Sequence, residues 1–256
     1  TTLTNTSTGT LSGVDTGVKN DGAITTLTNS GTISGDWAYG IWNRGGSTID
    51  NVINASTGVI SGGQSGIDNE GTISTLTNSG TIESTGSYSG IWNHGAGFIG
   101  GLTNNAGGVI SGVTAGIFNE GSISTLTNAG TISGGVSGLN TVNAAPAINN
   151  LGGATIGTLT NTGLIGGTNS SVAIWNNPDA IITTLTNDVG GAISGITHGI
   201  GSGGTIGTLT NSGTIGGANS DHGIWNFGGG TITELNNTST GVISGNFIGV
   251  SNEGEI

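Results

Sequence analysis

The sequence contains no cysteine, no methionine, only two prolines and only two basic side chains. The lack of cysteine excludes disulfides, iron–sulfur clusters and thiolate zinc sites, and it is compatible with an exported protein. Fourteen acidic residues give a formal net charge of −12. Nucleic acids and anionic membranes attract clustered cations, so neither is expected as a partner. The chain also lacks a run of about eighteen apolar residues, so we expect no membrane-spanning helix.

Apolar side chains are scarce too. Hydrophobic residues make up 32% of the chain and aromatic residues 4%, whereas glycine occupies 55 of the 256 positions. An ordinary globular core needs a richer supply of large aliphatic side chains. The chain is therefore either disordered or places its few apolar residues with strict economy, and the order of the residues decides between the two.

A repeat of about 25 residues answers this question. Each unit contains a Leu-Thr-Asn motif or a close variant, then Gly-x-Ile-Ser-Gly, then Gly-Ile-x-Asn as at 40–43 and 90–93. Within these segments apolar and polar residues alternate with the period of a strand. The content of Gly, Thr, Ser and Asn disfavours helix. The first motif ends at Asn5, Asn29, Asn54, Asn78, Asn104, Asn128, Asn161, Asn187, Asn211 and Asn237.

Three short strands per repeat describe one turn of a solenoid. The sequence predicts an all-β fold, a single-stranded parallel β-helix (β-solenoid) of about ten three-sided coils. Aliphatic side chains would stack in columns ~4.8 Å apart, and inward asparagines would hydrogen-bond from coil to coil. We expect residues 1–256 to form one array, a fragment of a longer solenoid, with a loop excursion near 136–147.

Two kinds of corner follow the first asparagine of each coil. Asn-x-Gly and Asn-x-x-x-Gly alternate along the chain, except that two short corners follow each other at Asn128 and Asn161. We expect the loop excursion to lie at this irregularity.

The segments Thr-Leu-Thr-Asn-Ser-Gly-Thr-Ile (75–82) and Gly-Ile-Trp-Asn (90–93) resemble the repeats of bacterial autotransporter (type V secretion) passenger regions. The resemblance covers essentially the whole chain. It implies a non-enzymatic stalk or adhesin segment, extracellular at the bacterial cell surface. It further implies adhesion to a host or neighbouring cell, glycan binding or self-association, with membrane contact only through a C-terminal barrel absent from this sequence. It transfers no catalytic residue.

Polysaccharide-active enzymes also use β-helices and are a second alternative. Lyases need cationic groups, and the only ones are Lys19 and Arg44. Hydrolases need paired carboxylates, and the closest pairs are Asp68/Glu70 and Glu253/Glu255. Because Asn-Glu-Gly is a recurring corner element, we interpret these acids as structural and expect no enzyme activity and no cofactor.

Charged or metal-ligating residues occupy equivalent positions of successive coils in two places. His198 and His222 are expected to stack within ~5 Å beside Asp221, which would suit a divalent ion. The interpretation we favour is two exposed loop residues that share a column, without metal. The other column follows the third-side asparagine and alternates in charge, which favours a structural charge ladder; it contains Asp21, Arg44, Glu70, His94 and Glu120.

A threonine array supports a different alternative. Thr-Leu-Thr occurs in seven coils, with Leu inward and both Thr in water; such arrays resemble the ice-binding surfaces of β-solenoid antifreeze proteins. Thr also simply favours strands. Asn51, Gly101 and Glu234 interrupt the array.

The binding prediction rests on the residue between Ile and Asn of Gly-Ile-x-Asn. Because both neighbours point inward, this residue is expected to point outward, and four of the five tryptophans occupy it. Trp42 and Trp92 should lie ~10 Å apart, as should Trp175 and Trp225. Each Trp could instead shield its own glycine-rich corner or Lys19. Since exposed apolar patches usually mark contacts, the predicted partner- or glycan-binding residues are Trp42, Trp92, Phe118, Trp175 and Trp225.

Overall fold

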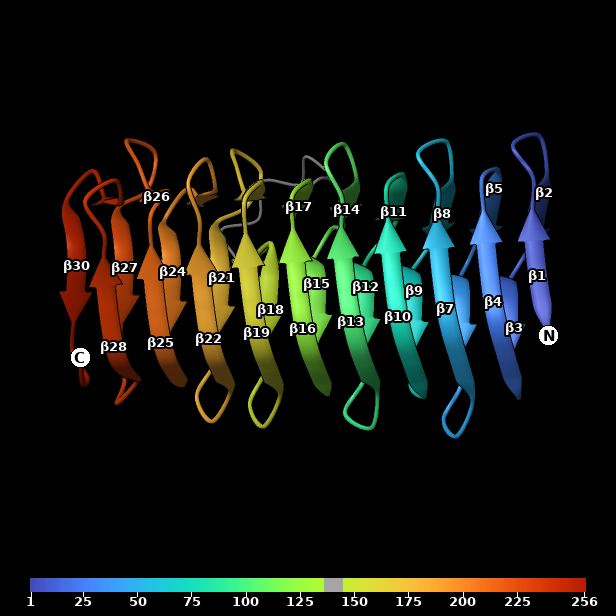
Figure 1. Cartoon of the computed structure of the whole chain (residues 1–256), viewed down its shortest axis with the longest axis horizontal. Coiled ribbons are helices and arrows are strands. Elements are labelled where there is room, and N and C mark those ends of the chain that lie inside the picture. The colour runs from blue at the N-terminus through green and yellow to red at the C-terminus, as the bar shows by residue number, and fades with distance from the viewer. Residues whose placement is uncertain (136–144) are drawn as a thin grey trace.

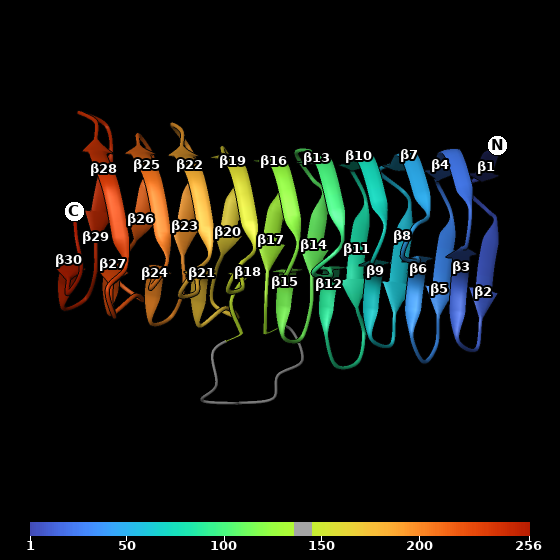
Figure 2. The same ribbon diagram turned by 90° about the horizontal axis from the view of Figure 1, so that it is seen from below.

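The computed structural model describes residues 1–135 and 145–256. Within these ranges the chain forms thirty strands and no helix. The strands make three parallel sheets of ten strands each, so that every coil contributes one strand to each sheet. The termini lie at opposite ends of the stack of coils (Figures 1 and 2). The predicted three-sided parallel β-helix is confirmed.

The first sheet holds the longest strands, most of them seven residues long. They are β1 (Thr2–Asn5), β4 (Ala23–Asn29), β7 (Thr48–Asn54), β10 (Thr72–Asn78), β13 (Phe98–Asn104), β16 (Ser122–Asn128), β19 (Thr155–Asn161), β22 (Ile181–Asn187), β25 (Thr205–Asn211) and β28 (Thr231–Asn237).

The second sheet has strands of three or four residues, bounded by glycine-rich corners. They are β2 (Thr10–Gly13), β5 (Thr32–Gly35), β8 (Val59–Gly62), β11 (Thr81–Ser84), β14 (Val109–Ser111), β17 (Thr131–Ser133), β20 (Leu164–Gly166), β23 (Ala192–Ser194), β26 (Thr214–Gly216) and β29 (Val242–Ser244).

The third sheet contains the Gly-Ile-x-Asn motifs and carries the predicted binding residues. Its strands are β3 (Thr16–Asn20), β6 (Tyr39–Asn43), β9 (Ser65–Asn69), β12 (Ser89–Asn93), β15 (Ala115–Asn119), β18 (Ile148–Asn150), β21 (Val172–Asn176), β24 (His198–Ser202), β27 (His222–Asn226) and β30 (Ile248–Asn252).

The core runs the length of the solenoid as columns of aliphatic side chains. Ile33, Ile60 and Ile82 lie opposite one another in the second sheet, and all three are fully buried. In the end coils Leu11 and Ile243 are only partly buried, since no further coil covers them. Few apolar residues suffice because the isoleucines and leucines that recur in every coil point at the axis, which resolves the sparse composition.

Buried asparagines form two ladders along the corners, as predicted. In the first ladder each amide nitrogen donates to the amide oxygen in the next coil, for example Asn29 to Asn54 at 2.9 Å and Asn54 to Asn78 at 2.8 Å. The same nitrogen also donates to the carbonyl of its own corner glycine, as from Asn29 to Gly31. Satisfying every amide proton makes burial of these polar groups tolerable.

The predicted corner irregularity is present. Asn128 and Asn161 each donate to the glycine two residues later, so two short corners do follow each other. Most of the loop predicted near 136–147 falls on residues 136–144, outside the described residues. Its predicted last residue, Ala147, directly precedes β18; it is fully buried and donates its N–H to the carbonyl of Val172.

In the part of the chain that the structure describes, no helix has the length and apolarity to cross a membrane.

Candidate functional site

The third sheet aligns the ten predicted positions in one register. The column starts with Lys19 opposite Trp42 and ends with Trp225 opposite Ser251. Ile41 and Asn43, which flank Trp42, are fully buried, so the tryptophan between them lies on the outer surface. We call the outer surface around Trp42, Trp92, Phe118, Trp175 and Trp225 the aromatic face. All five side chains are partly buried there, because neighbouring side chains cover them.

Both basic residues of the chain lie over the ring of Trp42. The Lys19 ammonium is 5.3 Å from the centroid of the indole and the Arg44 guanidinium carbon is 5.1 Å from it. The centroid of the Tyr39 ring lies 5.5 Å from that of the same indole. Trp42 Nε1 donates to Glu70 at 3.2 Å. The shielding contact with Lys19 that the sequence suggested as an alternative is therefore present, and cation–π attraction stabilises it.

Trp92 is the centre of a second set of contacts. Its ring stacks on Tyr88 at 5.0 Å and on His94 at 4.2 Å, and it meets Phe118 edge-on at 5.7 Å. The indole Nε1 donates to Glu120 at 3.1 Å. Edge-on and stacked geometries of this kind add stabilisation beyond the buried area.

The C-terminal half of the face carries a third set. The rings of Trp175 and Trp225 are 6.2 Å apart, and Phe227 lies 5.0 Å from the first and 4.6 Å from the second. His198 packs 4.8 Å from Trp225. The result is a continuous aromatic surface over β21, β24 and β27.

The predicted spacing of ~10 Å between Trp175 and Trp225 is wrong for their rings. The residue between them in the column is Gly201, which has no side chain. A Cβ at Gly201 would lie 2.5 Å from atoms of the Trp175 ring. The Trp175 ring therefore lies over Gly201 and approaches the ring of Trp225, which is two coils away.

Acidic or amide groups occupy the edges of these indoles. In three of the four tryptophans Nε1 donates to the glutamate that follows the third-sheet asparagine of the next coil. For Trp175 the residue at that position of the next coil is Gly203, and its Nε1 donates to an asparagine of its own coil. The pairs are Trp42 with Glu70, Trp92 with Glu120, Trp225 with Glu253, and Trp175 with Asn177. The Asn-Glu-Gly corners thus pair with the tryptophan of the preceding coil.

The two histidines do stack as predicted, but the interpretation as exposed loop residues is wrong, because they begin strands β24 and β27 and are partly buried. His198 lies opposite His222 in the register, with Nδ1 atoms 3.2 Å apart and ring centroids 5.0 Å apart. Burial, and secondarily the charge of His222, lowers the pKa of His198. Asp221 does not join them in a group of three ligand atoms within 4.8 Å of one another, judged over the described ranges.

The charge column is only partly realised. Arg44 pairs with Asp21 at 3.0 Å, but so does Lys19 at 3.1 Å, and the Glu70 oxygens accept from Trp42 and from the N–H of Gly45. The predicted charge ladder is therefore not continuous, because Glu70 is held by the indole of Trp42 and Arg44 pairs with Asp21. A hydrogen bond to Lys19 contributes most to lowering the pKa of Asp21.

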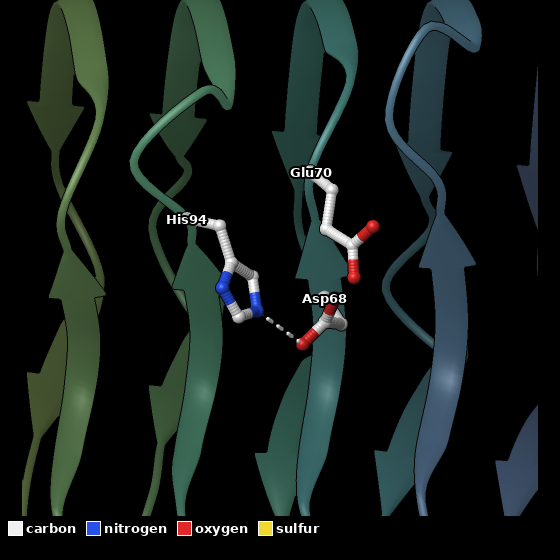
Figure 3. Close-up of side chains that lie close together, drawn as sticks. All are labelled: Asp68, Glu70 and His94. Carbon is white, nitrogen blue, oxygen red and sulfur yellow. Dashed lines mark hydrogen bonds and ion pairs between the residues drawn. The ribbon is translucent and has the colours of Figure 1, made fainter.

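Asp68, Glu70 and His94 come together although only the last two were predicted to share a column. His94 Nε2 lies 2.9 Å from Asp68 Oδ2 and Nδ1 lies 3.7 Å from Glu120. Figure 3 shows the His94 ring from one coil directed at Asp68 of the neighbouring coil, which also carries Glu70. One ligand atom from each of the three residues lies within 4.8 Å of the other two.

Protonation in this group follows from burial and charge. Burial raises the pKa of the fully buried Asp68, against the opposing hydrogen bond from His94. Burial also acts against charging His94, but its hydrogen bond to Asp68 and the nearby carboxylates raise its pKa overall. Burial, with the charges of Asp68 and Glu70, raises the pKa of Tyr39 to about 12. Asp68, His94 and Tyr39 therefore each release a proton at a higher pH than the same side chain does in water.

The threonine array has its longest uninterrupted stretch in four successive coils. These run from β16 to β25, with Thr125, Thr158, Thr184 and Thr208 in register. The array ends where Thr208 lies opposite Glu234.

Some aromatic residues escaped the sequence interpretation. Tyr39 and Tyr88 begin or precede the strands of Trp42 and Trp92 and fold onto them, and Trp37 is 75% exposed at a corner apart from the aromatic face. Phe227 follows a third-side asparagine. Continuing the charge column through the later coils would have identified Phe227 and Asn177.

Comparison of the chain with protein-family models, with curated proteins and with solved structures finds no match.

Proposed function

We propose that the chain is a non-enzymatic, extracellular stalk or adhesin segment of an autotransporter-like surface protein, and that its aromatic face binds a neutral glycan. The observation that carries the proposal is the gathering of indole rings on one outer surface, each with a carboxylate or amide at its edge. Aromatic rings offer an apolar platform to the C–H faces of sugars, and carboxylates accept hydrogen bonds from hydroxyl groups.

The net charge of the chain indicates which class of partner the aromatic face binds. With a net charge of −12, the chain repels acidic polysaccharides and other copies of itself. Lys19 and Arg44 already pair with Asp21, so they add little attraction for anions. A neutral glycan is favoured over an acidic one and over side-by-side association of two rods.

Enzyme activity is disfavoured at both of the closest carboxylate pairs. In the exposed pair Glu253/Glu255, Glu253 accepts a hydrogen bond from the indole of Trp225. The other pair is Asp68/Glu70. Asp68 has no exposed surface. A general acid must reach the atom that it protonates, and this carboxylate cannot contact a polysaccharide on the surface. We therefore propose a binding role.

The test is a binding assay on immobilised neutral oligosaccharides, with the four tryptophans of the aromatic face changed to serine together. We expect loss of binding with an unchanged far-UV circular dichroism spectrum. Trp37→Ser is the matched control, because it removes an exposed indole outside the face, and it should bind like the parent. Unaltered binding by the fourfold variant, or equal loss in the control, would contradict the proposal.

Ice binding is a second candidate, supported by the four coils of threonine in register. Thr158→Lys and Thr184→Lys together should then abolish inhibition of ice recrystallisation. The same variant should leave glycan binding intact, which separates the two candidates; no inhibition by the parent chain would remove ice binding.

A further inference from the structure

We propose that Asp68, Glu70 and His94 form a binding site for a divalent transition-metal cation of the Zn²⁺ class. The inference stands on the geometry of these three side chains. It shares Glu70, which accepts from Trp42, with the aromatic face, but it requires no bound glycan.

The donor set suits such an ion. An imidazole nitrogen and two carboxylate oxygens lie within 4.8 Å of one another. Around tetrahedral zinc, ligand atoms sit roughly 3.4 Å apart, as bond lengths near 2.1 Å require. The His94–Asp68 contact of 2.9 Å must open slightly. The Glu70 oxygens accept from Trp42 Nε1 and from the N–H of Gly45, and one of them must bind the ion through a remaining lone pair or exchange its present donor for the ion.

A buried oxygen in the group has no partner. Asp68 Oδ2 contacts His94, whereas Oδ1 has no hydrogen-bond partner among the described residues although Asp68 is fully buried. A buried carboxylate left without full compensation is costly. The two other cations of the chain are engaged by Asp21. A divalent ion would supply both the missing partner and the missing positive charge.

The surroundings prepare His94 as a ligand. Its Nδ1 faces Glu120 at 3.7 Å, and Glu120 is itself held by the indole of Trp92. A carboxylate on the far nitrogen fixes the ring orientation and raises the basicity of the coordinating nitrogen. The Trp92 ring stacked at 4.2 Å covers one side of the imidazole. These contacts hold the ring with Nε2 aimed at Asp68.

The ligand type favours a transition ion over calcium or magnesium. Imidazole suits Zn²⁺ and its neighbours, whereas Ca²⁺ and Mg²⁺ take mostly oxygen ligands. Three protein ligands leave one coordination position for water. That position can face solvent, since the side chain of His94 is 27% exposed.

The experiment is isothermal titration calorimetry of the untagged full chain with ZnCl₂ at neutral pH, after removal of bound metal by a chelator. We expect one bound ion and a higher melting temperature when it is present. Glu70→Gln and His94→Gln should each weaken the affinity at least about tenfold. Both side chains lie at the surface, so these variants should keep the parent circular dichroism spectrum.

The matched control is the double variant His198→Gln with His222→Gln, which removes the other imidazole pair and should leave the tight binding unchanged. Absence of binding at millimolar Zn²⁺ would overturn the proposal and leave a proton between Asp68 and His94 as the explanation. Binding that survives both ligand variants, or that disappears in the control, would also overturn it.

Discussion

Buried amides fix the alignment of consecutive coils, and one position of the second asparagine ladder departs from the pattern. There Asn176 donates to the hydroxyl of Ser202 at 3.3 Å, and the Ser202 hydroxyl donates to the carbonyl of Gly204. In the next coil the Oδ1 atom of Asn226 is buried without a hydrogen-bond partner in the described part of the chain. The missing amide at Ser202 leaves this acceptor unsatisfied.

Restoring the amide should stabilise the fold. Ser202→Asn places a donor opposite Asn226 in a register position that other coils fill with asparagine. We expect the free energy of unfolding to rise by about 1 kcal/mol, because a buried acceptor gains its partner. Chemical denaturation measures this, with Asn93→Ser as the converse change, which should lower it. A stabilisation absent in the first variant would contradict the role of the ladder.

Histidine protonation gives the stability a pH dependence of known sign. The pKa of His198 is lowered from 6.5, so the unfolded chain takes up this proton more readily than the folded chain. Its contribution to stability is therefore present above pH 6.5 and is lost as the pH falls through its folded-state pKa.

His198→Gln should make the loss of stability between pH 8 and pH 5 smaller than in the parent, measured by denaturation in the presence of a chelator. His94→Gln should have the opposite effect. The raised pKa of His94 gives a stabilisation that is complete below pH 6.5 and is lost as the pH rises through its folded-state pKa. Equal changes in the two variants would contradict the assignments.

The strands illustrate what periodic sequence determines and what it does not. Identical residues at fixed offsets predicted which positions pair across coils, and the register of Ile41, Trp42 and Asn43 is the one observed. The positions of rings depend instead on non-periodic neighbours. Gly201 lets two tryptophans meet, and His94 reaches diagonally to Asp68 rather than along its own column. Such contacts depend on side-chain length and rotamer, which a repeat pattern does not contain.

The inside and outside of a strand should differ in mutational cost. Ile132 is fully buried in β17 and Thr127 is exposed in β16. Ile132→Ala should lower the free energy of unfolding by ~2–4 kcal/mol through the cavity that it leaves. Thr127→Ala should change it by less than about 1 kcal/mol. Chemical denaturation compares the two, and equal costs would contradict the assignment of faces.

As a whole the molecule is a rod of stacked coils with one distinctive side. Ten coils at strand spacing give a length on the order of 50 Å, and the third sheet displays aromatic groups toward both ends of it. The two N-terminal tryptophans are separated by the buried Asp68, whereas the two C-terminal ones form one surface across Gly201. A rigid rod can present both groups to one long chain-like ligand, which suits an oligosaccharide better than a small molecule.

The most direct test of the aromatic face observes the five indole N–H signals of ¹⁵N-labelled protein by NMR during titration with neutral oligosaccharides. The account predicts shifts for Trp42, Trp92, Trp175 and Trp225, whose Nε1 protons lie on this face, and an unmoved signal for Trp37. Titration in which the Trp37 signal alone moves, or in which no neutral oligosaccharide moves any of the other four, would contradict it.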